Sequence, residues 1–423
     1  MLAALSRKHI ANAGRLGAAR RSARKAQRKT RMPAMKSTER KFEFLTREDP
    51  DTGARVTRLT PPDVTCHRNY FYQKCFTNDG RKLIFGGEFG PHPSPNWNYH
   101  LLDLDTQTAI QLTDGAGENT FGGFLSPDDR HLYFVRDKRQ FIRLELATLR
   151  EEVLYVVPDD WVGYGTWVSN SACTKIVGIE IAATDWFPLN TWQKFNEMFH
   201  ARPLCRLFNV DLATGKRTVI LEQRGWLGHP QYRPFDDNTV AYCHEGPHDL
   251  IDARMWFIDE NGTNRRCGKE HLEGESCTHE FWVPDGSAMI YVSYNTKSPE
   301  RWICSLDPVT LQNKVLTTMP QCSHLMSNYD GTLIVGDGVG QVSHDSTASN
   351  AMLVGDPYLH LFDLKAGTTR PIARHDSGWD VYKDDRQVTH PHPSFTPDNK
   401  QVLFSCDKER ANGVEPALYL ADL

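Results

Sequence analysis

A turn followed by a short apolar strand recurs seven times along the 423-residue chain, and this repeat limits the possible folds more than any other feature. Each turn is rich in Asp, Asn, Gly and Pro, and each strand is rich in aromatic and β-branched residues, as expected for short strands bounded by turns. The seven copies are TNDGRKLIF, SPDDRHLYFV, SNSACTKIVGIEI, PFDDNTVAYC, VPDGSAMIYVS, NYDGTLIVGD and TPDNKQVLFSC. A second strand-like run follows each copy and a third often follows that one, which indicates a repeated unit of about four strands.

The repeat predicts an all-β, seven-bladed β-propeller, because a solenoid would need polar caps on its terminal repeats. The seventh copy ends at Leu423 directly after its second strand, and residues 54–60 form a strand-like segment with no nearby partner. We expect this N-terminal strand to complete the last blade, since that pairing removes an exposed sheet edge. One convincing helical segment, residues 191–200, interrupts the third repeat. Residues 39–423 are therefore predicted to form a single propeller domain.

Charge divides the chain into a basic start and an acidic body. Eleven Lys and Arg residues and no acidic residue precede Glu39, so the remainder carries 38 basic and 53 acidic residues, a net charge of −15. A body this acidic argues against a nucleic-acid-binding surface. We interpret residues 1–38 as a disordered extension. An organelle transit peptide, a nucleic-acid-binding arm and a stretch upstream of a true start at Met35 remain open as alternatives.

Cysteine usage and hydropathy indicate where such a chain resides. The ten cysteines are scattered and form no CxxC pair, which favours buried free thiols in a reducing compartment over a disulfide framework. No apolar run approaches the roughly 20 residues that a membrane helix needs. No apolar segment precedes a small-residue cleavage site, so secretion is not expected. These features predict a cytoplasmic protein without a membrane partner.

Three histidines occupy the same phase in successive repeats. His279, His324 and His392 each stand six residues before the Asp of the following turn, on strands that we expect to line the propeller axis. Equivalent positions in the first two repeats hold Gln73 and Gly122. A single histidine there would be interpreted as an independent residue of the channel wall with a water partner. Three in phase on neighbouring blades favour a shared site.

The seventh repeat adds a Gln-x-x-His-x-His run, Gln387 to His392. Residues two apart in a strand point the same way, so His390 and His392 can direct two imidazoles at one point. Nitrogen-rich ligation suits Mn, Fe, Co, Ni or Zn, whereas an amide oxygen from Gln387 fits Mn or Ca better than Zn. Neutral ligands leave the full charge on a divalent ion. Such an ion could hold an anionic substrate on an acidic protein.

Long segments of the body resemble the oligogalacturonate lyase (oligogalacturonide lyase) family of pectin degradation, from about residue 41 to residue 423. The segments that carry the resemblance are CHRNYFYQKCFTNDG (66–80), NTFGGFLSPDD (119–129), WVGYGTW (161–167), LGHPQYRPFDDNTVAYCHEGPHDLIDARMWFI (227–258), GESCTHEFWVPDGSAMIYVSY (274–294), CSHLMSNYDG (322–331) and RQVTHPHPSFTPD (386–398). The resemblance implies a seven-bladed propeller. It also implies that Mn²⁺ is held by His324, Gln387, His390 and His392.

The same resemblance implies a β-elimination on short oligogalacturonates, chiefly the dimer and trimer. His279 would be the catalytic base, and Arg254 would take part in catalysis or bind the uronate carboxylate. A histidine suits the first role because its ordinary pKa lies near neutrality. Weaker candidates for substrate binding, each also readable as a polar rim or packing residue, are His229, Arg233, His244, His248, His67, Arg68 and Tyr72.

Two other classes of function compete with this reading. A non-enzymatic interaction propeller of the TolB or WD type explains the repeats equally well, but not the clustered histidines. A serine peptidase propeller would need an α/β-hydrolase domain with a G-x-S-x-G elbow, and the sequence contains no such pentapeptide. Metal-dependent hydrolysis of another anionic sugar is a further alternative. The sequence leaves the oligomeric state open.

Overall fold

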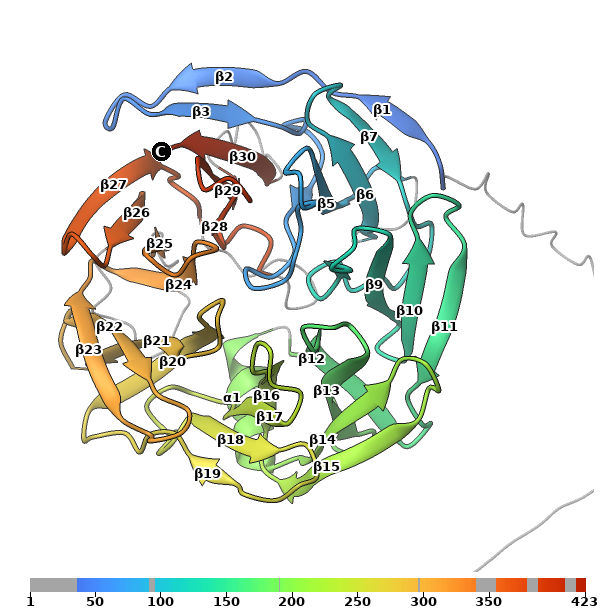
Figure 1. Cartoon of the computed structure of the whole chain (residues 1–423), viewed down its shortest axis with the longest axis vertical. Coiled ribbons are helices and arrows are strands. Elements are labelled where there is room, and N and C mark those ends of the chain that lie inside the picture. Colours follow the sequence, from blue (N-terminus) through green and yellow to red (C-terminus); the bar gives the residue numbers. More distant parts are fainter. Residues whose placement is uncertain are drawn as a thin grey trace, which may run out of the picture. The chain divides into compact units, whose positions relative to one another are not determined.

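Seven antiparallel sheets form a ring in the computed structural model of the chain, which confirms the predicted seven-bladed β-propeller (Figure 1). The structure describes residues 36–90, 96–189, 191–295, 297–339, 355–378, 387–407 and 416–423. Most of the predicted extension, residues 1–35, lies outside these ranges. Among the described residues, no helix is long and apolar enough to cross a membrane.

Each blade is ordered outward from a strand near the axis. Blade 1 contains β4 (Cys66–His67), β5 (Lys82–Gly87), β6 (Asn98–Asp103), β7 (Thr108–Gln111) and β1 (Glu39–Lys41). Blade 2 contains β8 (Phe124–Leu125), β9 (His131–Arg136), β10 (Gln140–Glu145) and β11 (Glu151–Val156). Blade 3 contains β12 (Trp161–Ser169), β13 (Lys175–Ala182), β14 (Leu204–Asp211) and β15 (Arg217–Arg224).

The remaining four blades carry most of the predicted site residues. Blade 4 contains β16 (Leu227–Tyr232), β17 (Thr239–His244), β18 (Met255–Asp259) and β19 (Arg266–Cys267). Blade 5 contains β20 (Glu275–Trp282), β21 (Met289–Asn295), β22 (Arg301–Leu306) and β23 (Asn313–Thr318). Blade 6 contains β24 (Cys322–Ser327), β25 (Leu333–Gly338), β26 (Tyr358–Asp363) and β27 (Thr368–Arg374). Blade 7 contains β28 (Ser394–Phe395), β29 (Gln401–Cys406), β30 (Ala417–Asp422), β3 (Arg55–Arg58) and β2 (Leu45–Glu48).

Blade 7 is completed by an N-terminal strand, as predicted. Strand β3 pairs antiparallel with β30, with Val56 opposite Ala421 and Arg58 opposite Tyr419. The ladder continues past β3, because the N–H of Leu59 donates to the carbonyl of Leu418 at 2.8 Å. This pairing leaves β30 with a neighbour on both sides. Two further outer strands, β1 on blade 1 and β2 on blade 7, were not predicted.

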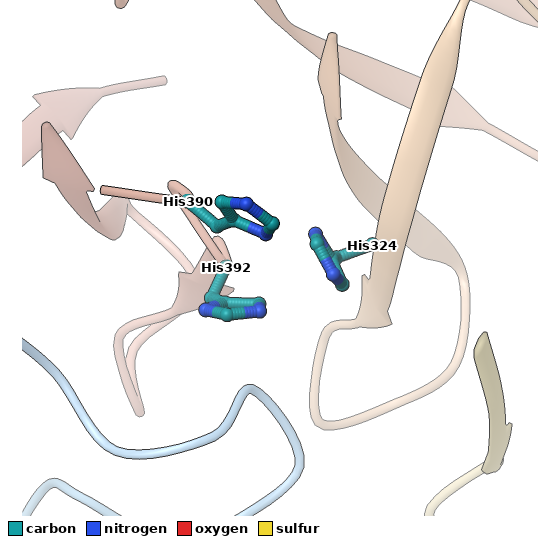
Figure 2. A group of neighbouring side chains, drawn as sticks. All are labelled: His324, His390 and His392. Atoms are coloured by element: carbon teal, nitrogen blue, oxygen red, sulfur yellow. The ribbon is translucent and has the colours of Figure 1, made fainter. Parts of the chain in front are cut away.

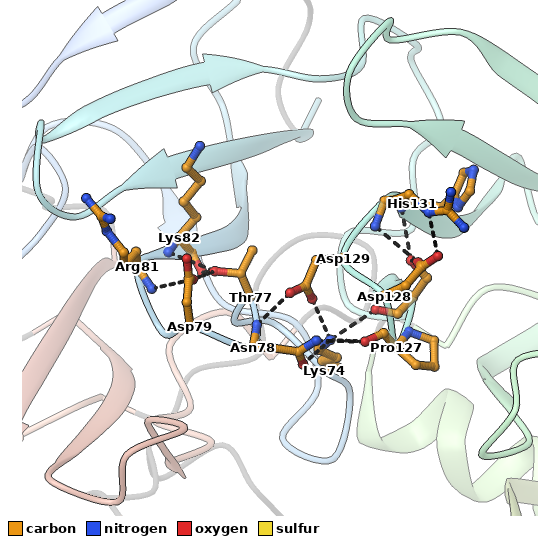
Figure 3. A network of polar contacts seen from close by, with 12 residues as sticks. Lys74, Thr77, Asn78, Asp79, Arg81, Lys82, Pro127, Asp128, Asp129 and His131 are labelled. Atoms are coloured by element: carbon orange, nitrogen blue, oxygen red, sulfur yellow. Dashed lines mark hydrogen bonds and ion pairs between the residues drawn. The ribbon is translucent and has the colours of Figure 1, made fainter.

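The repeated turns are built by their own side chains. In blade 1 the Thr77 hydroxyl donates to Asp79 at 2.6 Å, and Asp79 also accepts the N–H of Arg81 at 3.0 Å (Figure 3). Blade 2 repeats this arrangement with Ser126 and Asp128 at 2.6 Å. Side chains that bond their own backbone in this way are the reason that Thr, Ser and Asp mark such turns.

Figure 3 also shows that the first two turns are tied to each other. The ammonium of Lys74 lies 2.6 Å from Asp129 and 2.8 Å from Asn78. The N–H of Asn78 donates to the second oxygen of Asp129 at 2.7 Å. Polar bonds between turns thus support the contact between blades 1 and 2.

Hydrophobic contact between adjacent blades forms the core. Between blades 6 and 7, for example, Val335 and Leu359 pack with Val402 and Phe404, all almost completely buried. The single helix described, α1 (Trp192–Ala201), begins one residue later than predicted, after Thr191, whose hydroxyl caps the N–H of Lys194. Its Met198 belongs to the cluster between blades 3 and 4.

A segment that follows β4 of blade 1 contacts blades 3, 5 and 6. The ring of Phe71 contacts Phe281 of blade 5 and His324 of blade 6, with centroid distances of 6.5 and 5.8 Å. The hydroxyl of Tyr72 bonds to Thr166 of blade 3 at 2.5 Å. Residues 70–72 therefore pack beside the histidines near the axis.

Candidate metal centre

Three of the four predicted metal ligands converge. His324 extends from β24, and His390 and His392 extend from the segment before β28 (Figure 2). One ring nitrogen from each of the three histidines lies within 4.8 Å of the corresponding nitrogens of the other two. The ring centroid of His324 is 4.1 Å from that of His392 and 5.5 Å from that of His390. All three side chains are buried. The structure thus places side chains from two neighbouring blades around one point.

The backbone near these histidines departs from regular strand geometry. The pairing of β24 with β25 shifts register between Cys322 and Leu325, so His324 lies in a bulge. His392 has φ of 46°, in the left-handed region that residues other than glycine seldom adopt. Proline precedes and follows it. Bulges and unusual dihedrals re-aim side chains, which explains how strand residues come to face one another here.

The three imidazole rings are arranged in a way that suits binding of a cation between them. The Nε2 atom of His392 is buried and has no hydrogen-bond partner among the residues that the structure describes. Burial and the neighbouring His324 and His390 lower the pKa of His392 well below its ordinary value, so its ring is neutral. Neutral imidazole nitrogens are the form that binds divalent metal ions. The donor set therefore suits a first-row divalent ion.

Gln387 begins the turn that carries two of these histidines. Its backbone carbonyl accepts the N–H of His390 at 3.1 Å, and its side chain is partly exposed. The turn thus places the backbone of Gln387 within hydrogen-bond distance of His390.

His279 lies beside the cluster. Its ring centroid is 4.4 Å from that of His324, and its Nδ1 atom is 3.4 Å from the Ser323 hydroxyl. It occupies a bulge of β20 with φ of 55°. Desolvation, then the positive charges that His324 and Arg254 can carry, lower its pKa well below the ordinary value. A neutral, partly exposed imidazole is the state that can accept a proton.

Arg254 is buried between two carboxylates. Its Nε donates to Glu280 at 2.8 Å, and its terminal nitrogens lie 3.4 Å from Glu280 and Glu245. Burial opposes the charge, but Cys243, Glu280 and Glu245 together raise the pKa of Arg254 well above its ordinary value. These three bonds engage three of the five N–H groups of a guanidinium. Within the part of the chain that the structure describes, two N–H groups of Arg254 therefore have no assigned acceptor.

Two of the weaker candidates lie near this arginine. The Nε2 of His229 is 3.1 Å from Glu245, and its ring faces Tyr70 at a centroid distance of 5.7 Å. His248 bonds to the hydroxyl of Tyr294 through Nδ1, and burial and Arg254 lower its pKa to about 4. Both side chains are partly exposed.

Three weaker candidates contact residues of the outer strands, the turns or blade 3. Arg233 donates to the carbonyl of Gly286 at 2.7 Å, in the turn of the next blade. His244 stacks on Trp256 of an outer strand, with a centroid distance of 4.9 Å. Tyr72 bonds to Thr166, as described above.

His67 and Arg68 are packed within blades 1, 2 and 7. His67 is fully buried, stacks on Phe121 at 4.6 Å and lies 3.0 Å from the hydroxyl of Thr120. Arg68 is 1% exposed and bonds to Ser394 and to the carbonyl of Asn69. For both residues the interpretation as packing side chains accounts for these contacts.

Several residues of the site were not predicted. Asp337 in β25 accepts hydrogen bonds from His324 and His392, and its side chain is fully buried. Glu245 and Glu280 hold Arg254. His229 was predicted as a weaker candidate for substrate binding, but its phase was not: it stands seven residues before Asp236 because its turn has one additional residue. It therefore belongs to the same phase as the other axial histidines.

Comparison with known proteins points to one family. A family model described as oligogalacturonate lyase matches residues 34–423. An oligogalacturonate lyase of Dickeya dadantii (strain 3937) is 61% identical over 381 residues, which is 90% of this chain and 96% of that protein. A solved oligogalacturonate lyase in complex with manganese is 62% identical, with a TM-score of 0.84 over 92% of this chain and 98% of that chain. A solved oligogalacturonate lyase from Vibrio parahaemolyticus is 53% identical, with a TM-score of 0.83 and the same coverage.

Proposed function

The chain belongs to the oligogalacturonate lyase family, and on that premise we propose that it cleaves short oligogalacturonates by β-elimination during pectin breakdown. The products would be a 4,5-unsaturated uronate and a shortened sugar acid. The convergence of three buried imidazoles beside His279 is the observation that carries this proposal. We assign the activity to one catalytic domain, residues 39–423, in the cytoplasm, with residues 1–38 as an extension.

We assign the metal site to His324, His390 and His392, with Gln387 as a fourth ligand. A solved relative described as a complex with manganese supports Mn²⁺ as the ion. A bound divalent ion supplies Lewis acidity toward a carboxylate whose charge grows as the neighbouring carbon loses its proton. The three histidines would hold it, and imidazole ligands add no negative charge that would offset its own.

His279 is assigned as the general base that removes the proton at C5 of the uronate. Its ring is neutral and partly exposed, and it adjoins His324. Arg254 is assigned to the uronate carboxylate through the N–H groups that its own glutamates leave unused. Preorganised charge of this kind is usually the largest contribution to catalysis. The leaving oxygen at C4 would take its proton from water.

Sugar contacts are assigned to the polar residues near Arg254. His229 and His248 are included because both are partly exposed near this arginine. His67, Arg68, Tyr72, Arg233 and His244 have partners within or between blades. We assign no sugar contact to these five residues.

Incubation with digalacturonate tests the proposal. The ultraviolet absorbance of an unsaturated uronate should increase with time, stop increasing after chelation and increase again after addition of Mn²⁺. Formation of saturated galacturonate alone would favour a metal-dependent hydrolase instead. Metal binding without any product would favour an interaction propeller. His390→Ala should retain the fold and lose the metal stoichiometrically, as measured by elemental analysis.

A further inference from the structure

One buried carboxylate links the two blades that carry the clustered histidines. Asp337 is 0% exposed and lies in β25. Its Oδ1 accepts the backbone N–H of His324 at 2.7 Å. Its Oδ2 lies 2.8 Å from the Nδ1 of His324 and accepts the backbone N–H of His392 at 3.1 Å. A single side chain therefore receives three donors from two neighbouring blades.

The bulge in β24 makes the backbone N–H of His324 available to the carboxylate of Asp337. Regular pairing of β24 with β25 stops at Cys322 opposite Gly338 and resumes at Leu325 opposite Gly336. The N–H of His324 then lacks a ladder position and bonds to Asp337 instead. Gly336 leaves room for the Leu325 side chain beside this bulge, because a Cβ atom there would lie 2.6 Å from Leu325 Cδ2. Aspartate is uncommon in strand interiors, so a buried one at this position requires such a specific set of donors.

The same bonds determine which nitrogen of His324 carries the proton. A carboxylate at 2.8 Å from Nδ1 holds the proton there, because it can only accept. The lone pair of that ring then lies on Nε2, the nitrogen that can bind a cation. A carboxylate behind a metal-binding imidazole fixes its tautomer and orientation and increases its basicity.

The bond to His392 holds the second blade. His392 has a left-handed φ of 46° between two prolines, a conformation that needs support from its surroundings. Its N–H donates to Asp337 across the boundary between blades 6 and 7. The separation of the two rings, 4.1 Å between centroids, is thus fixed through one carboxylate.

We propose that Asp337 is a positioning residue that holds His324 and His392, on different blades, in the geometry that binds the divalent ion. This inference rests on the proposed function, because it assumes that these histidines hold the ion.

Asp337→Asn in the full chain tests the inference. The amide has nearly the same shape but only one accepting oxygen, so it cannot serve all three donors. We expect the Mn²⁺ dissociation constant, measured by calorimetry without substrate, to rise by about 10–100-fold. Unchanged affinity would overturn the inference. Wild-type protein that binds no Mn²⁺ would overturn the proposed metal site itself, so the two failures are distinguishable.

Asp49→Asn is a matched control. Asp49 is 5% exposed and accepts backbone N–H groups from Asp51 and Thr52 at 3.1 Å and from Arg374 at 2.9 Å. It joins blades 6 and 7 on their outer side, away from the histidines, so its variant should keep wild-type affinity. Equal weakening in both variants would overturn the inference.

A measurement on the wild-type protein covers the case in which Asp337→Asn does not fold. Nitrogen NMR of ¹⁵N-histidine-labelled apoprotein, with the His324 signal assigned from a His324→Gln variant, reports which ring nitrogen carries the proton. We expect Nδ1–H. An Nε2–H tautomer would overturn the inference.

Discussion

Three axial histidines share a backbone conformation that strands rarely contain. His229, His279 and His392 have φ values of 47°, 55° and 46°. His229 and His279 lie where the inner strand shifts register against its neighbour. Conformational strain of this kind persists at sites where side chains must be aimed, at a cost of order 1–3 kcal/mol each. The histidines near the axis thus depend on local distortion of the strands as well as on their place in the repeat.

His279→Gln should separate proton transfer from metal binding. Loss of a general base typically lowers turnover by about 10²–10⁴-fold. The variant should keep its Mn²⁺, because His279 lies beside the cluster of His324, His390 and His392 and is not a member of it. Initial rates of unsaturated uronate formation and elemental analysis measure the two properties. Turnover at the wild-type rate would contradict the assignment of His279 as base.

Arg254→Gln should lower both activity and stability. Removal of the guanidinium leaves Glu245 and Glu280 buried without their cation, which typically costs about 3–5 kcal/mol. Urea unfolding measures the loss. Addition of Glu280→Gln to this variant should recover part of the stability but none of the activity.

Arg301→Gln is the control for arginine burial as such. Arg301 is 7% exposed and bonds to Gln321 and to the carbonyl of Cys322. Its replacement should reduce stability less than that of Arg254 and leave turnover unchanged. A loss of turnover equal to that of Arg254→Gln would show that arginine burial in general, and not the glutamate-bound guanidinium, supports the activity.

At the residue scale, repeat phase identified the histidines but not the groups that hold them. His279, His324 and His392 stand at one offset from the turn Asp, so counting alone places them together. Asp337 is a lone Asp within a strand, and its partners are separated from it by 13 and 55 residues. No periodic signal joins such positions, because only the packing of blades 6 and 7 brings them into contact.

At the scale of elements, the inner strands and the closing strand could be predicted, but the outermost additions could not. Strand β3 was predicted because the last repeat lacked a partner strand. Strands β1 and β2 have the sequences ERK and LTRE and are mostly exposed, so they lack the apolar alternation that marks a strand. Their pairing depends on the edges that β7 and β3 offer.

Leu59→Pro tests the closing ladder. Proline removes the N–H that Leu59 donates to Leu418 and should lower the free energy of unfolding by about 3 kcal/mol. Leu59→Val keeps the donor and most of the apolar volume, so it should cost about 1 kcal/mol. Thermal unfolding of both variants measures the difference. Equal melting temperatures would show that the ladder bond contributes little to ring closure.

At the scale of the whole molecule, buried neutral histidines should make the fold sensitive to acid. Burial lowers the pKa of His375 to about 4 and that of His100 to about 3, whereas both ordinarily titrate near 6.5. Above pH 6.5 both histidines are neutral in the folded and in the unfolded state. Between pH 6.5 and pH 4 the two histidines bind protons in the unfolded state but not in the folded state. The free energy of unfolding therefore falls as pH falls.

Urea unfolding of the metal-free protein at about pH 7 and about pH 5 measures this decrease in the free energy of unfolding. Each such histidine contributes up to about 1.4 kcal/mol per pH unit to the decrease. His375→Gln removes one of these groups and should make the dependence on pH shallower. His375 accepts the N–H of Ser377 at 2.9 Å, and glutamine can also accept there. Stability that rises toward pH 5 would contradict the expected sign.

The pairing of β3 with β30 has a consequence for biosynthesis. Strand β3 leaves the ribosome early, but its partner lies 359 residues or more downstream, at Ala417–Asp422. The free edge of β3 therefore stays unpaired until the ribosome has made the chain as far as Asp422. His390 and His392 are made shortly before β30, so the proposed cation-binding centre and the closed ring should form at nearly the same stage of synthesis.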